Sequence, residues 1–159
     1  MNYQKQTQLA VAMDRGRATI VELMDAGAVA AADVRALRRD VFSHGRVSRD
    51  EADAIFALEA SNAAKCPEWT GFFVETITDH VVWDSRPTGV VNESQGEWLI
   101  ARADVCASVN ALAVLVNVLA EAHRVPGWFV SAVRSRGARG WAGVDIALRL
   151  AEAEMALAA

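Results

Sequence analysis

Within the stretch Arg38–Phe56, RRDVFSHGRVSRDEADAIF, one helix is expected to end, the chain to turn and another helix to begin. Gly45 stands in the turn, where glycine adopts backbone conformations that other residues avoid. Ser48 and Glu51 have the spacing of a capping box, in which each side chain accepts a hydrogen bond from the other residue's backbone N–H. The stretch therefore predicts a helix on each side of a short turn.

On either side of this stretch, apolar residues at helical spacing divide the rest of the chain into further helices. Gly27 ends the first predicted helix, and Pro67 stands in the first turn of the fourth. Ile20, Leu23 and Met24 share one face of the first helix. The fourth has an apolar stripe of Trp69, Phe73, Ile77 and Val81. The predicted helices cover about 6–26, 31–42, 49–62, 67–83, a segment from 93, 105–123, 127–133 and 142–157.

The composition agrees with this helical pattern. Alanine, the best helix former, dominates many segments, whereas the β-branched and aromatic runs typical of strands are sparse. A chain of 159 residues fits one domain and buries enough surface to fold without disulfides or metal. We therefore expect a single all-α domain over residues 1–159, a compact bundle of about seven or eight helices.

Three inter-helix turns repeat one pattern of glycine, any residue, valine, and an acid or amide six residues after the glycine. They run from Gly27 to Asp33, from Gly45 to Glu51 and from Gly89 to Gln95. Asp40 and Asp84 stand five residues before the second and third glycines. Two predicted helices separate these two glycines, and an antiparallel hairpin returns the chain to its starting end. The second and third turns are therefore expected to meet.

This pattern resembles the EF-hand loop, which has Asp at position 1, Gly at position 6 and Glu at position 12. The resemblance covers an EF-hand-like pair over about 31–103, followed by C-terminal helices over 104–159. It implies a short β-bridge between Val47 and Val91, which occupy position 8 of the two loops. The turn style and helix order also resemble the TerB-like tellurium-resistance proteins of bacteria, a compact all-helical family linked to metal stress.

The oxygen ligands of the two loops are incomplete. Phe42 and His44 occupy positions 3 and 5 of the Asp40 loop, and Arg86 occupies position 3 of the Asp84 loop. Calcium needs six to eight oxygens. Ser48 with Glu51, and Asn92 with Gln95, are explained by helix capping alone. The residues thus predict a degenerate helix–loop–helix pair with no metal ligand set and no cofactor.

Composition also limits the class of partner and the compartment. The net charge of −4 argues against a nucleic-acid binder. Cys66 and Cys106 form no CxxC pair, which favours a reducing, cytoplasmic setting. The apolar segment 105–120 is shorter than a membrane span and contains polar residues, so no membrane partner is expected.

No catalytic set is predicted. His80 could join Asp79 and Cys66 in a site, but a packed histidine is the expected reading. Neither a nucleophile elbow nor a phosphate loop occurs. His123 is placed at a helix C-terminus, where the helix dipole accounts for it. A small basic patch of Arg134, Arg136 and Arg139 beside Trp141 is interpreted as an exposed turn.

The leading hypothesis is a non-enzymatic cytoplasmic structural or protein-interaction domain. Trp83 lies off the main apolar stripe of its helix and is the tryptophan expected to contact a protein partner. The alternative is a divalent-metal-binding or metal-stress-related protein that uses the Asp40 and Asp84 loops, with ligands from Asp40, Ser48, Glu51 and Asp84. The sequence does not predict the partner or the oligomeric state.

Overall fold

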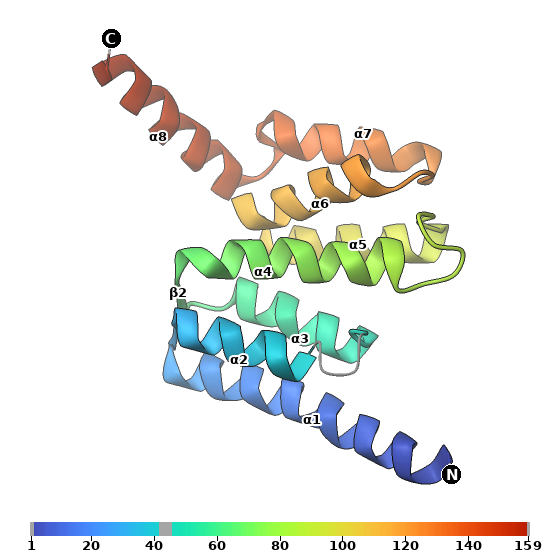
Figure 1. Ribbon diagram of the computed structural model, residues 1–159. Helices are drawn as coiled ribbons and strands as arrows, with labels where there is room; N and C mark the ends of the chain where they lie inside the picture. The colour runs from blue at the N-terminus through green and yellow to red at the C-terminus, as the bar shows by residue number, and fades with distance from the viewer. Residues whose placement is uncertain (1, 42–45, 159) are drawn as a thin grey trace.

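The computed structural model describes residues 2–41 and 46–158, and these ranges form an all-α protein, as predicted (Figure 1). The α-helices are α1 (Asn2–Ala26), α2 (Ala31–Val41), α3 (Arg49–Ala60), α4 (Pro67–Thr78), α5 (Glu93–Cys106), α6 (Val109–Glu121), α7 (Gly127–Ser135) and α8 (Ala142–Ala158). Two π-helical turns, η1 (Asp79–Trp83) and η2 (Arg136–Gly140), and two short strands, β1 (Ala28–Val29) and β2 (Ala64–Lys65), complete it.

The helices stack from α1 at one side of the molecule to α7 at the other, with α4 across the middle (Figure 1). Helix α4 packs against α2 and α6, while α1 packs against α2 and α3. Helix α5 contacts both α3 and α6. Helix α8 touches α6 and η2 near its start and then projects away from the stack (Figure 1). No helix within the described ranges has the length and apolar character needed to cross a membrane.

The core is centred on the stripe predicted for the fourth helix. Trp69, Phe73, Ile77 and Val81 are all buried. The ring of Phe73 stacks on Trp69 and meets Phe56 of α3 edge-on. Burying a large apolar side chain stabilises a fold by about 1.5–3 kcal/mol, so this row fixes α4 between its neighbours. Ile20 and Leu23, on the face predicted for the first helix, are buried, whereas the side chain of Met24 on that face is 38% exposed.

The helix ends follow local sequence signals, with one exception. Gly27 has a φ of +75° and stops α1, and Pro67 is the first residue of α4. The predicted start of the sixth helix at Val105 is wrong, because α5 continues to Cys106 and α6 begins at Val109. Ala107 takes a left-handed conformation with a φ of +46°, and the Ser108 side chain then accepts from the Ala111 N–H to cap α6. The chain therefore bends between α5 and α6.

The Gly27 turn is held by a two-stranded parallel pairing. Ala28 pairs with Ala64, and Val29 pairs with Lys65. This pairing joins the turn before α2 to the connection between α3 and α4. The described residues of the Gly27 turn are thus paired with the α3–α4 connection.

Candidate functional site

The turns before α3 and α5 lie at the same end of the molecule, as the helical hairpin predicts. The Val47 N–H donates to Asp84 Oδ2 at 3.5 Å, and His80 Nδ1 donates to the Val47 carbonyl oxygen at 2.8 Å. Helices α3 and α4 therefore return the chain to the point where it left. We call this the loop end; it comprises residues 46–48, 84–92 and 122–126.

Both capping boxes form as predicted. The Glu51 N–H donates to Ser48 Oγ at 3.1 Å, and the Ser48 N–H donates to Glu51 Oε1 at 3.0 Å. Asn92 and Gln95 exchange the equivalent bonds at 2.8 and 3.0 Å. Residues at positions 9 and 12 of the EF-hand-like loops thus start helices, which leaves fewer of their oxygens for an ion.

The β-bridge implied between Val47 and Val91 does not form. The Val91 N–H donates instead to the Arg124 carbonyl oxygen at 2.9 Å, and Val90 forms a parallel bridge with Arg124. The Asp84 loop therefore pairs with the connection between α6 and α7. The backbone N–H and carbonyl of Val47 are hydrogen-bonded to the side chains of Asp84 and His80.

The described side chains do not gather into a metal centre. No three His, Cys, Asp or Glu residues among them lie close enough together to hold an ion. Asp40 belongs to α2, but its side chain, like Phe42 and His44, lies outside the described part of the chain. Asp84 accepts a backbone hydrogen bond from Val47. The metal-binding hypothesis therefore gains no ligand cluster from the described residues.

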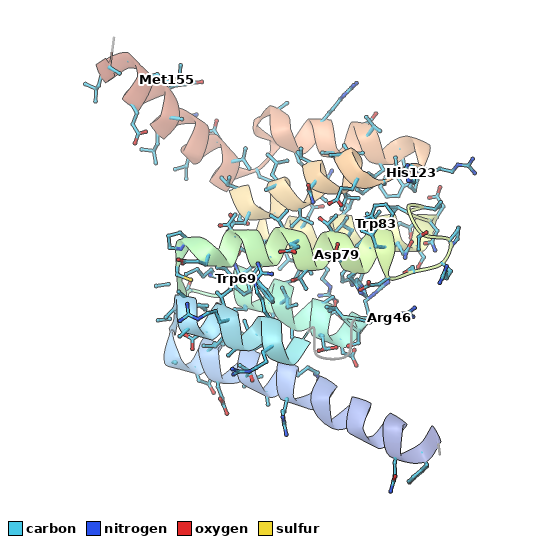
Figure 2. The ribbon with its side chains drawn as sticks, in the orientation of Figure 1. Arg46, Trp69, Asp79, Trp83, His123 and Met155 are labelled. Carbon is cyan, nitrogen blue, oxygen red and sulfur yellow. The ribbon has the colours of Figure 1, made fainter. Side chains whose placement is uncertain are left out.

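Trp83 is the prominent surface group at the loop end, and it is exposed as predicted. Its side chain is 37% exposed, and its Nε1–H donates to Glu121 Oε1 at 3.1 Å. The His123 ring meets the Trp83 ring edge-on, with ring centroids 6.0 Å apart. Figure 2 shows Asp79, Trp83 and His123 near this end of the molecule. We call Asp79, Trp83, Glu121 and His123 the Trp83 face.

Helix α6 supplies the part of this face that the sequence reasoning missed. Asn117 Nδ2 donates to Glu121 Oε2 at 2.7 Å and to Thr78 Oγ1 at 2.9 Å. It therefore joins α6 to the end of α4 and holds the carboxylate that receives the Trp83 indole. Asn117 and Glu121 are four residues apart, which is the spacing of neighbours on a helix surface; this signal was present in the sequence.

Asp79 is the most perturbed carboxylate of the Trp83 face. Burial, followed by the negative charges of Asp84, Glu75 and Glu121, raises its pKa to about 6. Each neighbouring carboxylate disfavours the ionised form of Asp79. The face therefore holds an excess of negative charge that a cation would stabilise.

His123 is not in the last turn of a helix, in contrast to the prediction. Helix α6 ends at Glu121, and the His123 N–H donates to the Gly89 carbonyl oxygen at 2.7 Å. Its ring lies over Gly89, where a Cβ atom would come within 2.4 Å of His123 Cδ2. His123 thus locks the Asp84 loop onto the α6–α7 connection.

The possible group of His80, Asp79 and Cys66 does not assemble. Cys66 precedes α4, whereas Asp79 and His80 follow it, so the 12-residue helix separates them by about 18 Å. Burial lowers the pKa of His80, which packs against Trp98 and donates to Val47. His80 is therefore a packed neutral histidine, as expected.

A second polar cluster lies at the opposite end of α4. Glu59 Oε2 accepts from Trp69 Nε1 at 2.6 Å, and Glu59 Oε1 accepts from Ser108 Oγ at 3.0 Å. Asn110 Nδ2 also donates to Glu59, at 3.4 Å. These bonds join α3, α4 and the start of α6 around the buried Glu59 carboxylate. A buried carboxylate needs hydrogen-bond partners in any fold, so the cluster is explained without a functional role.

A cavity of about 290 Å³ opens between α1, α3 and α5. Its lining is mainly apolar, with the Asp53–Arg102 ion pair at one side. Cys106 contributes its thiol, which donates to the Phe56 carbonyl oxygen. Burial raises the pKa of Cys106 to about 11, so the thiol stays protonated and is a poor nucleophile at neutral pH.

The predicted basic patch is partly neutralised. Arg136 forms two hydrogen bonds of 2.7 Å with the Asp104 carboxylate, and Trp141 Nε1 donates to the same group at 2.9 Å. The Arg136 guanidinium lowers the pKa of Asp104 below its ordinary value. Arg134 is exposed, and the side chain of Arg139 lies outside the described part of the chain. Arg136 thus has a structural role.

Comparison with known proteins adds no relative. No family model matches the chain, and neither a curated protein nor a solved structure resembles it significantly.

Proposed function

We propose that this protein is a non-enzymatic interaction domain that binds a basic segment of a partner protein through the Trp83 face. The observation that carries this proposal is an exposed tryptophan that is already fixed in position. Trp83 is 37% exposed, while its indole N–H is bonded to Glu121 and its ring edge contacts His123. Tryptophan is enriched among the residues that dominate binding energy at protein interfaces.

The rigidity of Trp83 favours binding because little side-chain freedom remains to be lost. Asn117 holds Glu121, and Glu121 in turn accepts from the Trp83 indole. Ordering a flexible side chain at an interface costs about 0.5–1.5 kcal/mol. A ring held by both a hydrogen bond and an aromatic contact avoids part of this cost.

The charge of the face indicates the chemistry of the partner. Asp79 and Glu121 flank Trp83, and the pKa of Asp79 is raised first by burial and then by repulsion from the acids around it. A lysine or arginine of the partner would offset this repulsion. The same cation could lie over the tryptophan ring, an arrangement worth about 0.5–2 kcal/mol depending on exposure.

Two observations support a binding role over catalysis. The polar residues at the starts of α3 and α5 are occupied by capping bonds, and His80 donates to a backbone carbonyl. Cys106, with its pKa raised to about 11, is a protonated thiol at neutral pH. These groups therefore serve the fold in the described arrangement.

The test is a calorimetric titration of the intact chain with a lysine–alanine peptide and with a glutamate–alanine peptide of the same length. We expect binding of the basic peptide only. Trp83→Ala should weaken it by about 30-fold, the effect of losing an interface residue worth about 2 kcal/mol.

Trp128→Ala is the matched control. Trp128 is also 37% exposed and also donates its indole N–H to a glutamate, Glu93, but it lies beside Gly96 on another part of the surface. This variant should bind the basic peptide like the unaltered chain. Equal weakening by both substitutions, or the absence of binding to the basic peptide, would contradict the proposal.

A further inference from the structure

The geometry points to a second interaction surface, on which α8 pairs in parallel with α8 of a second copy of this chain. The row that would meet its counterpart consists of Ile146, Leu150, Ala153 and Leu157, and we call it the α8 seam. This inference uses residues remote from the Trp83 face and is independent of the proposed function.

The first observation is that α8 leaves the body of the protein. Trp141 and Val144 are buried where the helix begins, whereas residues 149–158 are exposed. Figure 2 shows Met155 on the part of α8 that projects away from the other helices. Most helical stability in proteins comes from packing of one face. The outer turns of α8 gain no such packing from their own chain.

The second observation is the spacing of the exposed apolar residues. The α8 seam residues are separated by four, three and four positions, which is the a/d repeat of a coiled coil. Ile146, Leu150 and Leu157 are 59%, 62% and 90% exposed. Large apolar side chains in a continuous row on a surface typically mark an interface.

The third observation is the direction of the seam. At about 100° per residue, the α8 seam lies about 180–240° around the helix from Val144. Among the described side chains of α8, Val144 is the one that is buried against the body. The seam therefore faces away from the body, and two copies can join their α8 helices while their bodies remain on the outside.

Charge complementarity selects the second copy and the parallel orientation. Arg149 and Glu154 flank the α8 seam at the positions conventionally named g and e. In a parallel pair, position g of one helix meets position e of the next heptad on the other helix, five residues further along. Arg149 of each copy therefore faces Glu154 of the other, which gives two ion pairs per dimer. An antiparallel pair brings position g to g and position e to e, so it would form neither of these two ion pairs. Arg149 already contacts Asp145 of its own helix, and its 71% exposed side chain can also reach across.

A membrane surface fits α8 less well. Helices that bind anionic lipid are rich in lysine and arginine, whereas the outer part of α8 has Arg149 as its cation beside Glu152 and Glu154. The seam is short, about two heptads, so the pairing should be weak and reversible.

Sedimentation equilibrium of the full chain, from low micromolar to submillimolar concentration, tests the inference. We expect a reversible monomer–dimer equilibrium. Leu150→Glu should weaken it at least about 30-fold, because a charge enters the centre of the seam. Met155→Glu is the matched control, since Met155 is 73% exposed on the other side of α8; it should change the constant less than about 3-fold.

Charge reversal tests the orientation. Arg149→Glu and Glu154→Arg should each weaken the dimer, and the double variant should restore it, although the Asp145 contact stays broken. A chain that remains monomeric, a dimer indifferent to Leu150→Glu, or a double variant that fails to recover would overturn the inference. Binding to phosphatidylserine vesicles that depends on Leu150, in place of dimer formation, would also overturn it.

Discussion

The turns at Gly27 and Gly89 have the same local pattern but very different surroundings. Both glycines have positive φ, +75° and +79°, and both turns take part in a short parallel backbone pairing. A Cβ atom on Gly27 would meet nothing within 4 Å, whereas one on Gly89 would collide with the His123 ring. The first turn needs glycine for its conformation, and the second needs it for conformation and for space.

This difference explains why the Gly89 turn is part of a site. The His123 ring that covers Gly89 also supports Trp83, so the turn and the Trp83 face are built from the same contact. At Gly27 the paired strands simply fasten α1 and α2 to the α3–α4 connection. A repeated sequence pattern thus fixes a backbone turn, while the neighbouring chain determines what the turn is used for.

The largest expected loss of stability is that of Gly89→Ala. The left-handed conformation costs alanine about 1–2 kcal/mol, and the collision with His123 adds about 1–3 kcal/mol. We expect the free energy of unfolding to fall by about 3 kcal/mol for Gly89→Ala and by about 1 kcal/mol for Gly27→Ala, as measured by urea denaturation.

A double variant isolates the collision. In a His123→Ala background, Gly89→Ala should cost about as much as Gly27→Ala, because the obstructing ring is gone. Equal losses for the two single glycine variants would contradict the distinction between the turns.

A smaller effect is expected at Asp79, which lies beside the Asp84 loop. Its pKa is about 6 in the folded protein, against an ordinary value of 3.8. The folded state therefore binds more protons than the unfolded state between these values, so stability falls as pH rises from about 4 to about 6 and then levels off. Asp79→Asn should remove this dependence.

The stability expected to be gained by Asp79→Asn is modest. The difference between the ordinary pKa of 3.8 and the folded-state pKa of about 6 corresponds, without screening, to about 3 kcal/mol of stability lost on ionisation. Solvent screens the charges around this partly exposed carboxyl, which reduces the expected stabilisation above pH 7 to about 1 kcal/mol. Urea denaturation at several pH values measures it. A variant less stable than the parent at pH 8 would argue against repulsion at Asp79.

Much of the helical framework could be predicted because its signals are local. Ser48 and Glu51, which are three positions apart, form a capping box at the start of α3. Pro67 marks the start of α4, because the first turn of a helix does not need the N–H that proline lacks. The break between α5 and α6 was predicted, but it was placed before Val105 instead of at Ala107 and Ser108, since Ala107 takes a left-handed conformation without the usual glycine. Ser108, which caps α6, was the available signal.

The candidate site was predictable only in part. Trp83 could be expected at the surface because it lies off the apolar stripe of its own helix. Glu121 and Asn117, which hold it, come from a helix more than thirty residues later. The pairing of Val91 with Arg124, in place of Val47, likewise depends on how α6 and α7 pack, which no local pattern records.

The most direct test of the proposed function is an NMR titration of the Asp79 carboxyl carbon with and without the lysine–alanine peptide. Alone, Asp79 should titrate near pH 6, because burial and three neighbouring acids raise its pKa. A peptide cation on the Trp83 face would offset that repulsion, so the pKa should fall toward 3.8 in the complex. A bound peptide that leaves the Asp79 titration unchanged would contradict the account.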